Sequence, residues 1–282
     1  MKILITGTSG QLGHDVQEAL DGNGFDILTP SHKDLDITDF ESVSDYFDDN
    51  RPDTVIHCAA YTAVDRAEDE IELCRKVNVD GTKNIVESCK KINSKLMYIS
   101  TDYVFDGSKD GLWLPDDQTN PINVYGTSKR DGEELVLGLN NYFIVRTSWV
   151  FGINGNNFVK TMLRLSNDRD TLNVVSDQIG SPTYTKDLAD LIVKMIFSNN
   201  YGIYHAHNEG FCSWAEFAKE IFRQARKETK IVPITSDMYP VKAKRPKNSR
   251  LSTESLIANG FELLPDWKNA LSRYLGELGY QL

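Results

Sequence analysis

The sequence contains few cysteines and no long apolar run, and each shortage excludes a class of protein. Only four cysteines occur among 282 residues, and no two of them form a CxxC pair. A disulfide-stapled scaffold and a paired-cysteine metal site are therefore excluded, and we expect reduced thiols in a cytoplasmic protein. No apolar stretch approaches the ~20 residues that cross a bilayer. A strand-like run occupies residues 1–6, where a signal peptide would lie, so we expect neither a membrane protein nor an exported one.

Positive charge is also scarce. Lysine and arginine number 31 against 41 aspartates and glutamates, which gives a net charge of −10. This balance argues against nucleic acid or an anionic membrane as a partner, although a local basic pocket could still receive an anionic small molecule. The five histidines form no HExxH motif or tight cluster, so the sequence predicts no metal site. The paired acids, such as Glu133-Glu134, are interpreted as solvated carboxylates.

Strand-like and helix-like segments alternate through the first half of the chain. The β-rich runs cover residues 3–6, 26–29, 54–57, 95–100 and 142–146. The amphipathic stretches between them cover residues 11–20, 39–48, 67–91 and 124–137. Such alternation is typical of βαβ crossovers, which build a parallel sheet with helices on both faces. The sequence therefore predicts an α/β fold with a Rossmann-like, doubly wound parallel sheet, and Asp39 is expected to cap the second helix.

Three glycines follow the first predicted strand. Gly7-Thr-Ser-Gly10-Gln-Leu-Gly13 is a GxxGxxG motif between a strand and a helix. Backbone without side chains can approach a pyrophosphate there, and the helix N-terminus supplies N–H donors. A site that prefers NAD usually places an acid at the end of the second strand, but here the chain reads Thr-Pro-Ser-His32-Lys33. We therefore predict NADPH as the cofactor, with NADH as an alternative, because hydroxyls and basic groups suit a 2′-phosphate; an ordinary solvated loop is the other interpretation.

After Gly152 the alternation loosens. Strand-like pieces at residues 172–175, 202–205 and 230–234 are separated by helical segments and proline-bearing loops. We predict that residues 1–150 form an NADP(H)-binding Rossmann domain. Residues 151–282 are predicted to form a smaller, mainly substrate-binding part, with some of its elements returning to the main sheet. The helix at residues 214–227 is interpreted as core or as a subunit contact.

A phenol and an ammonium lie four residues apart in Tyr125-Gly-Thr-Ser-Lys129, and hence on one face of a helix. Tyrosine titrates near ~10, and a neighbouring cation lowers that pKa by stabilising the phenolate, which makes the phenol a usable acid or base. Ser100-Thr101-Asp102 ends the fourth predicted strand, and ligands bind at the carboxyl ends of parallel strands. The sequence therefore predicts that Tyr125 and Lys129 form a catalytic pair close to Ser100-Thr101-Asp102.

Together these motifs resemble the extended short-chain dehydrogenase/reductases, and more closely the dTDP-4-dehydrorhamnose reductases. The resemblance covers nearly the whole chain. It is carried by Asp36-Ile-Thr-Asp39, Ala59-Ala-Tyr-Thr-Ala-Val-Asp-Arg-Ala-Glu68, Ser100-Thr-Asp-Tyr-Val-Phe-Asp-Gly107, Pro121-Ile-Asn-Val-Tyr-Gly-Thr-Ser-Lys129, Arg146-Thr-Ser-Trp-Val-Phe-Gly152, Gly155-Asn-Asn-Phe-Val-Lys-Thr-Met-Leu163, Asp177-Gln-Ile-Gly-Ser-Pro-Thr183 and Arg245-Pro-Lys-Asn-Ser-Arg-Leu251.

The resemblance implies NADPH-dependent reduction of the C4 keto group of dTDP-4-dehydro-L-rhamnose to dTDP-L-rhamnose, a step in polysaccharide biosynthesis. Tyr125 would protonate the sugar oxygen, Lys129 would hold the nicotinamide ribose, and Thr101 would orient the sugar. The residues implied to bind the cofactor, besides that pair and the glycines Gly7, Gly10 and Gly13, are Gln11, Leu12, Asp36, Ile37, Ala60, Tyr61 and Thr62. Those implied to bind the substrate, besides Thr101, are Asp102, Tyr103 and Trp149.

Several alternatives stay open from the sequence. Another nucleotide-sugar epimerase, reductase or dehydratase of the superfamily is one, although Tyr103 stands where dehydratases carry a glutamate after the Thr-Asp pair. A catalytically silent, NADP-binding regulatory subunit is another. The resemblance raises Mg²⁺ as a requirement in some relatives, and a homodimer is expected from apolar helix faces. Arg245, Lys247 and Arg250 could neutralise a diphosphate, or they could form a basic surface loop.

Overall fold

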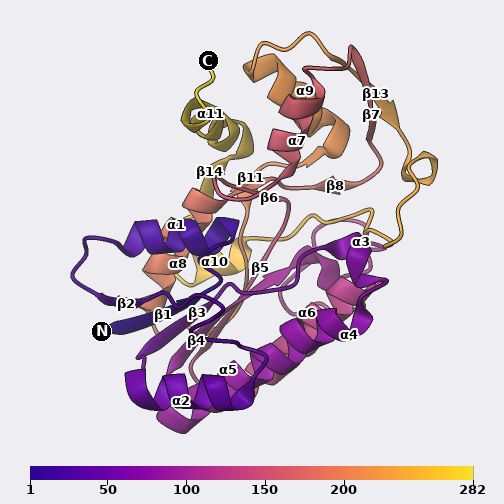
Figure 1. Cartoon of the computed structure of the whole chain (residues 1–282). Coiled ribbons are helices and arrows are strands. Elements are labelled where there is room, and N and C mark those ends of the chain that lie inside the picture. Colours follow the sequence, from indigo (N-terminus) through magenta and orange to yellow (C-terminus); the bar gives the residue numbers. More distant parts are fainter. Residues whose placement is uncertain (282) are drawn as a thin grey trace.

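The computed structural model describes residues 1–281, and its centre is a parallel sheet of six strands (Figure 1). The strands follow the order β10-β5-β4-β3-β1-β2, and every neighbouring pair is parallel. Their bounds are β1 Lys2–Thr6, β2 Asp26–Leu28, β3 Thr54–His57, β4 Lys95–Thr101, β5 Tyr142–Thr147 and β10 Gly202–His205. The predicted Rossmann-like, doubly wound α/β fold is confirmed.

Two layers of helices bury the two faces of the sheet, because successive strand residues point to opposite sides. In β1, Ile3 and Ile5 pack into one core with the helices on that face, and Leu4 packs into the other core. The first layer holds α1 Gln11–Leu20, α8 Thr185–Ile196 and α10 Glu254–Ala258, and the second holds α2 Phe40–Asn50, α5 Gly81–Ile92 and α6 Val124–Val136 (Figure 1). Residues 3–5 of β1 are therefore all apolar and buried, because both faces of this parallel strand are covered.

The predicted cap of the second helix is confirmed, and the long third helix is corrected. The side chain of Asp39 accepts hydrogen bonds from the backbone N–H groups of Glu41 and Ser42 at the start of α2. The stretch predicted as one helix over residues 67–91 is instead α3 Val64–Ala67, α4 Ile71–Arg75, the π-helical turn η1 Lys76–Asp80 and α5. The helix is interrupted at residues 68–70 and then runs through residues 71–92 with the π-helical turn inside it. In that turn the side chain of Asn78 bonds to Tyr61 and Ser128, in other segments of the chain.

The C-terminal part packs around a second core. Its elements are β6 Val150–Phe151, α7 Phe158–Leu165, β7 Thr171–Val175, β8 Ile179–Gly180, β9 Thr183–Tyr184, β11 Asn208–Glu209, β12 Cys212–Ser213, α9 Trp214–Gln224, β13 Lys230–Ile234, β14 Leu264–Asp266 and α11 Trp267–Glu277. The strands form four two-stranded pairs, and the helices α7, α9 and α11 share one apolar cluster. β10 and α8 follow residue 151 in the sequence, yet they lie in the large sheet and its helical layer. Among residues 1–281, no helix has the length and apolar character that a bilayer crossing requires.

The interpretation of Glu133 as a solvated carboxylate is wrong. Glu133 is 3% exposed, and its carboxylate forms a two-pronged ion pair with Arg146 of β5 at 2.9 and 2.7 Å. Ser100 of β4 donates a hydrogen bond to the same carboxylate at 2.5 Å. The pair joins α6 to β5 and, through Ser100, to β4, one turn along α6 from Lys129, which is predicted to be catalytic. Its charges are matched inside the protein, which is the condition for burying them.

Removing one partner of this ion pair should destabilise the fold strongly. Glu133→Ala leaves the Arg146 guanidinium buried without a counter-charge, so we expect a loss of about 3–5 kcal/mol in the free energy of unfolding, measured by urea denaturation. Glu134→Ala is the matched control, because Glu134 is exposed and its loss should change stability by no more than about 0.5 kcal/mol. Equal effects of the two substitutions would contradict the buried pair.

Candidate active site

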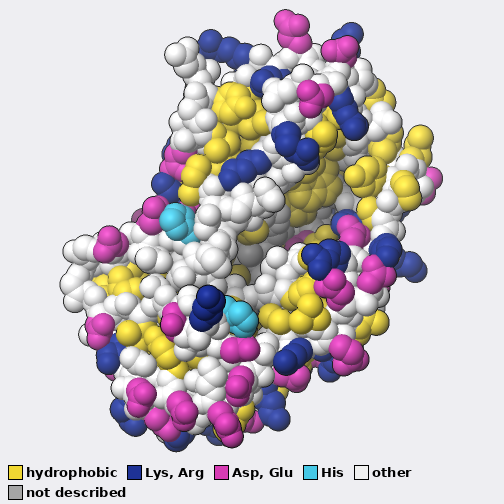
Figure 2. All heavy atoms as spheres, in the orientation of Figure 1, with side chains coloured by type: hydrophobic (Ala, Val, Ile, Leu, Met, Phe, Trp, Pro, Cys, Tyr) yellow, Lys and Arg dark blue, Asp and Glu magenta, His cyan; other side chains and the backbone are white. Residues whose placement is uncertain are grey.

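A cleft of about 990 Å³ opens at the carboxyl ends of the large sheet's strands. Figure 2 shows it as a hollow between the two parts of the molecule, with hydrophobic side chains along the wall of the C-terminal part. Of the residues that the resemblance assigned to cofactor, substrate or chemistry, all but Tyr61 line it. They are Gly7, Gly10, Gln11, Leu12, Gly13, Asp36, Ile37, Ala60, Thr62, Thr101, Asp102, Tyr103, Tyr125, Lys129 and Trp149. Which of them contacts a bound molecule stays a prediction.

Among the residues that the resemblance assigned to the site, Tyr61 lies outside the lining of the cleft. Its hydroxyl donates to Glu70 at 2.6 Å, and its backbone N–H donates to Asn78 at 2.8 Å. Asn78 also donates to the Ser128 hydroxyl on α6 at 2.9 Å. The π-helical turn within the predicted long helix thus connects the loop after β3 to the helix that carries Tyr125 and Lys129.

The glycine loop is packed so closely that larger residues would not fit. Gly7 has a φ of +74°, and a Cβ on it would lie 2.6 Å from the backbone nitrogen of Ala59. A Cβ on Gly13 would lie 2.3 Å from the carbonyl oxygen of Gly7. Gly10 stands at the N-terminus of α1, where no side chain caps the helix. The first N–H groups of α1 therefore face the cleft with their positive dipole end, which suits a phosphate.

The far end of the cleft lies at the tip of β2. Residues 29–32 line it, and Lys33 does not. Asp36 accepts hydrogen bonds from the backbone and hydroxyl of Thr38 at 2.9 and 2.8 Å, so its position is set by a local turn. His32 is exposed and lies 3.8 Å from Asp36. No acid lies among residues 29–32 at the strand tip. Of the two basic residues predicted to suit a 2′-phosphate, His32 lines the cleft and Lys33 does not.

Tyr125 and Lys129 lie side by side on α6, whose N-cap Asn123 accepts from the backbone of Gly126 at 2.7 Å. Lys129 is 2% exposed. Its ammonium lies 3.9 Å from the ring centroid of Tyr98, which is a cation–π contact. Burial lowers the pKa of Lys129 to about 7. Burial is also the main cause that raises the pKa of Tyr125, while hydrogen bonding to Thr101 lowers it. The site therefore holds a protonated phenol and a desolvated amine on one helix.

The end of β4 supplies the hydroxyl and the carboxylate of the site. Thr101 donates to Asp102 at 3.0 Å and accepts from the backbone N–H of Tyr103 at 3.2 Å. Asp102 is 2% exposed, and one of its oxygens lacks a hydrogen-bond partner among residues 1–281. Burial raises the pKa of Asp102 to about 6. The Tyr103 ring meets the Tyr125 ring edge to face at 5.7 Å between centroids. Phenols and a buried acid thus converge at one point of the cleft.

Trp149 and Trp214 form one wall of the cleft. Their rings stack at 3.6 Å between centroids with an interplanar angle of 12°. The sequence interpretation of the 214–227 helix as core or subunit contact missed Trp214 as a cleft residue. The neighbouring Asn156 was missed as well. Asn156 stands in the 155–163 stretch that carries the resemblance, so it had a local signal. Nothing in the local pattern marks Trp214, because it reaches the cleft through packing between segments distant in the sequence.

The basic residues near the C-terminus are already paired with acids or amides. Arg245 forms a two-pronged ion pair with Asp65 at 3.1 and 2.6 Å. Lys247 lies 3.4 Å from Asp177, and Arg250 donates to Asn248 at 2.8 Å. None of the three lines the cleft. A diphosphate would have to compete with these partners, which weakens their assignment to it.

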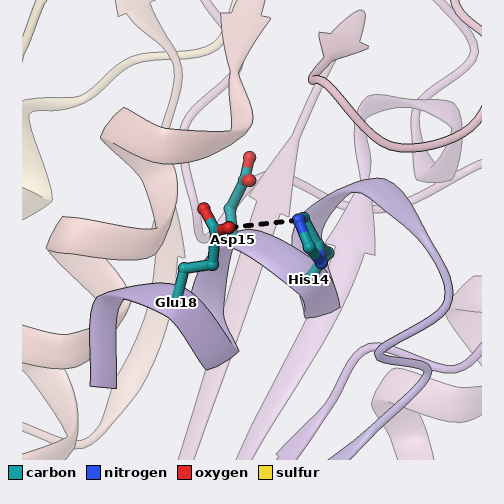
Figure 3. A group of neighbouring side chains, drawn as sticks. All are labelled: His14, Asp15 and Glu18. Carbon is teal, nitrogen blue, oxygen red and sulfur yellow. Dashed lines mark ion pairs between the residues drawn. The ribbon is translucent and has the colours of Figure 1, made fainter. Parts of the chain in front are cut away.

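A group of possible metal ligands lies on α1, outside the lining of the cleft (Figure 3). One ligand atom each from His14, Asp15 and Glu18 lies within 4.8 Å of the others, and His14 pairs with Glu18 at 3.4 Å. Asp15 is 2% exposed, and burial raises its pKa. The nearby hydroxyl of Thr185 donates instead to the carbonyl of Phe151, so both oxygens of Asp15 remain without a donor among residues 1–281.

Comparison of the whole chain with known proteins identifies its family. The family model of the RmlD substrate binding domain matches residues 1–279. A dTDP-4-dehydrorhamnose reductase of Aggregatibacter actinomycetemcomitans is 44% identical over 285 residues, which cover 96% of this chain and 97% of that protein. The spore coat polysaccharide biosynthesis protein SpsK of Bacillus subtilis (strain 168) is 42% identical over 277 residues, or 98% of this chain and 97% of that protein.

A solved structure agrees along the whole length. The crystal structure of dTDP-4-dehydrorhamnose reductase from Bacillus anthracis str. Ames, in complex with NADP, is 45% identical and matches with a TM-score of 0.95. The match covers 98% of this chain and 99% of that one. The chain belongs to the RmlD substrate binding domain family, alongside dTDP-4-dehydrorhamnose reductases.

Proposed function

We propose that the protein is an NADPH-dependent oxidoreductase that reduces the C4 keto group of dTDP-4-dehydro-L-rhamnose to give dTDP-L-rhamnose, for polysaccharide biosynthesis. The observation that carries the proposal is the meeting of Tyr125, Lys129 and Thr101 in the same cleft as the glycine loop, in a chain of this family. The relative from Bacillus anthracis solved with NADP supports the choice of cofactor. NADH stays the alternative.

Bound NADPH supplies the hydride that adds to C4 of the sugar. Tyr125 donates its phenolic proton to the C4 oxygen as negative charge develops there. An alkoxide is a stronger base than a phenolate, so the raised pKa of Tyr125 keeps the proton on the enzyme until the alkoxide forms. The Lys129 ammonium stabilises the phenolate that remains. The hydroxyl of Thr101 donates to Asp102 in the structure. With substrate bound, this hydroxyl would donate to the sugar oxygen instead and so orient the carbonyl.

The remaining assignments follow the lining of the cleft. Gly7, Gly10, Gln11, Leu12 and Gly13 would meet the pyrophosphate. Asp36 and Ile37 would meet the adenosine end, while Ala60, Tyr61 and Thr62 would border the nicotinamide half, with Tyr61 acting through its backbone. Asp102, Tyr103 and Trp149 would face the sugar. The two-domain division at residue 150 is part of the same proposal, with the sheet holding the dinucleotide and residues 151–282 contributing mainly to the substrate side.

Magnesium, which the resemblance raised, has a donor set that fits on α1. Asp15 and Glu18 would hold the ion through their carboxylates, and water would complete the shell, as Mg²⁺ prefers oxygen ligands. The two undonated oxygens of buried Asp15 support this assignment. The ion would offset their charge beside α8 and so act on stability; no step of the reaction proposed above passes through it.

The homodimer and the cytoplasmic location also stay proposals. Two apolar side chains on α4 support a subunit contact, because Ile71 and Leu73 are 45% and 47% exposed. Four free cysteines, none of them bridged, support a reducing compartment. Sedimentation of the full chain would give the oligomeric state directly.

Replacing the proton donor should remove turnover and spare cofactor binding. Tyr125→Phe deletes one oxygen and keeps the ring against Tyr103, so we expect kcat for NADPH oxidation with dTDP-4-dehydro-L-rhamnose to fall at least about a hundredfold. The Kd for NADPH, measured by fluorescence titration, should change by less than about threefold. Near-wild-type kcat in this variant would refute the role of Tyr125.

The wild-type protein distinguishes the two alternative functions. If it purifies with NADP(H) already bound and interconverts sugars without net oxidation, it is an epimerase. If it binds NADPH but turns over no keto-sugar, it is a regulatory subunit.

Replacing the buried lysine should stabilise the fold in a pH-dependent way. Relative to the unfolded chain, whose lysine titrates near ~10.4, folding disfavours the ammonium because the pKa of Lys129 drops to about 7. This penalty is complete below the folded pKa and fades as the pH rises toward the unfolded one. Lys129→Met should therefore raise the free energy of unfolding by on the order of 3 kcal/mol near pH 6.5 and by clearly less near pH 9.5.

The control for this prediction is Lys219→Met, since Lys219 is exposed on α9. It should show no difference between the two pH values in urea denaturation. A gain for Lys129→Met that is the same at both pH values would mean that the lysine is not desolvated.

A further inference from the structure

Trp149 has a backbone conformation that a tryptophan rarely adopts. Its φ is +49°, in the left-handed region. That region is strained for a bulky residue, and the conformation persists only where surrounding contacts enforce it. Residues held in such conformations cluster at functional sites. Trp149 is partly buried and lines the cleft, so the question is which contacts hold it there.

Two contacts from the C-terminal part hold the indole of Trp149. The ring of Trp214 stacks on it at 3.6 Å between centroids and 12° between planes. Gly180 touches it too, since a Cβ added to Gly180 would lie 2.8 Å from Cε2 of that indole. Both contacts come from one small unit, because β8 and β12 pair antiparallel with Gly180 opposite Cys212, two residues before Trp214.

The position of Trp214 is itself rigidly determined. It is the first residue of α9, directly after a capping box in which Ser213 and Glu216 bond to each other's backbone at 3.1 and 2.7 Å. On its outer side the ring of Phe158 from α7 lies 4.6 Å away. The indole pair is therefore anchored in the second core and presented to the cleft as one apolar surface.

We infer that Trp214 is a positioning residue for the substrate: it fixes Trp149, and the stacked indoles bind the sugar through its C–H surface. This inference rests on the proposed function. An indole face offers no partner to a hydroxyl, so a hydroxyl pressed against it loses its hydrogen bonds to water. The C–H edges and methyl group of a deoxysugar lose none and gain contact area. The wall should therefore contribute to affinity for the sugar and not to affinity for the nucleotide.

The experiment compares the binding of dTDP with that of dTDP-L-rhamnose by calorimetry, in the presence of NADP⁺. The wild type should bind the sugar nucleotide more tightly than dTDP. In Trp214→Leu we expect the Kd for dTDP-L-rhamnose to rise about tenfold, the size of one aromatic contact, while the Kd for dTDP changes by less than about twofold. In turnover assays of this variant, KM should rise by a similar factor and kcat should fall by less. Trp214→Phe keeps an aromatic face and should restore most of the affinity.

A second variant and a control separate positioning from loss of packing. Gly180→Ala adds a methyl group whose three nearest neighbours are atoms of the Trp149 ring, and it keeps Trp214 in the sequence. It should show the same sugar-specific loss. Trp267→Leu removes a buried indole from the same apolar cluster, next to Phe217 but outside the lining of the cleft. It should lower the melting temperature as Trp214→Leu does, with the ratio of the two Kd values unchanged.

The outcomes that overturn the inference differ from those that overturn the function. Equal losses of dTDP and dTDP-L-rhamnose affinity in Trp214→Leu, or an unchanged sugar affinity, would refute the positioning role even if the wild type oxidises NADPH with the keto-sugar. A wild type that shows no such oxidation and yet binds dTDP-L-rhamnose through the indole wall would refute the proposed reaction and leave the positioning role in place.

Discussion

The site depends on one physical constraint, the burial of an ammonium without a carboxylate of its own. Lys129 lies over the face of Tyr98, which attracts a cation through its π electrons and offers no negative charge. Tyr98 can lie there only because Gly132, one turn further along α6, has no side chain; a Cβ would come within 2.2 Å of the Tyr98 hydroxyl. Desolvation then keeps the pKa of Lys129 near 7, so the amine gains the most from any negative charge that forms beside it.

Two strands of the large sheet keep a nearby carboxylate from neutralising Lys129. The nearest buried carboxylate on the same helix, Glu133, is fully engaged by Arg146 and Ser100, so it offsets the burial of Lys129 only in part. The consequence is a division of charge on α6, with a satisfied ion pair behind the cleft and an unsatisfied ammonium facing it. A desolvated ammonium of this kind interacts more favourably with its surroundings when a phenolate or a sugar oxygen beside it becomes charged.

How much of this could be predicted from sequence depends on the distance between the residues that meet. The glycine loop, the Tyr125–Lys129 pair and the hydroxyl at the end of β4 are local signals on single elements, and the structure brings them into one cleft. The burial of Glu133 had a local signal that was overlooked, since residues 125, 129 and 133 share one helix face. Trp214 had none, because its place depends on the pairing of β8 with β12 across more than thirty residues. The π-helical turn at Asn78 was equally hidden, because the partners of its side chain lie in other segments.

The most direct measurement of the central constraint is the titration of Lys129 itself. The protein is labelled with ¹³C at the lysine ε-carbon, and the Lys129 signal, assigned by its loss in Lys129→Met, is followed by NMR as the pH is raised in the cofactor-free state. A midpoint near 7 is expected for an ammonium buried over Tyr98. A midpoint near ~10, the ordinary value for lysine, would mean that the amine is hydrated or paired, and it would contradict the electrostatic basis of the site.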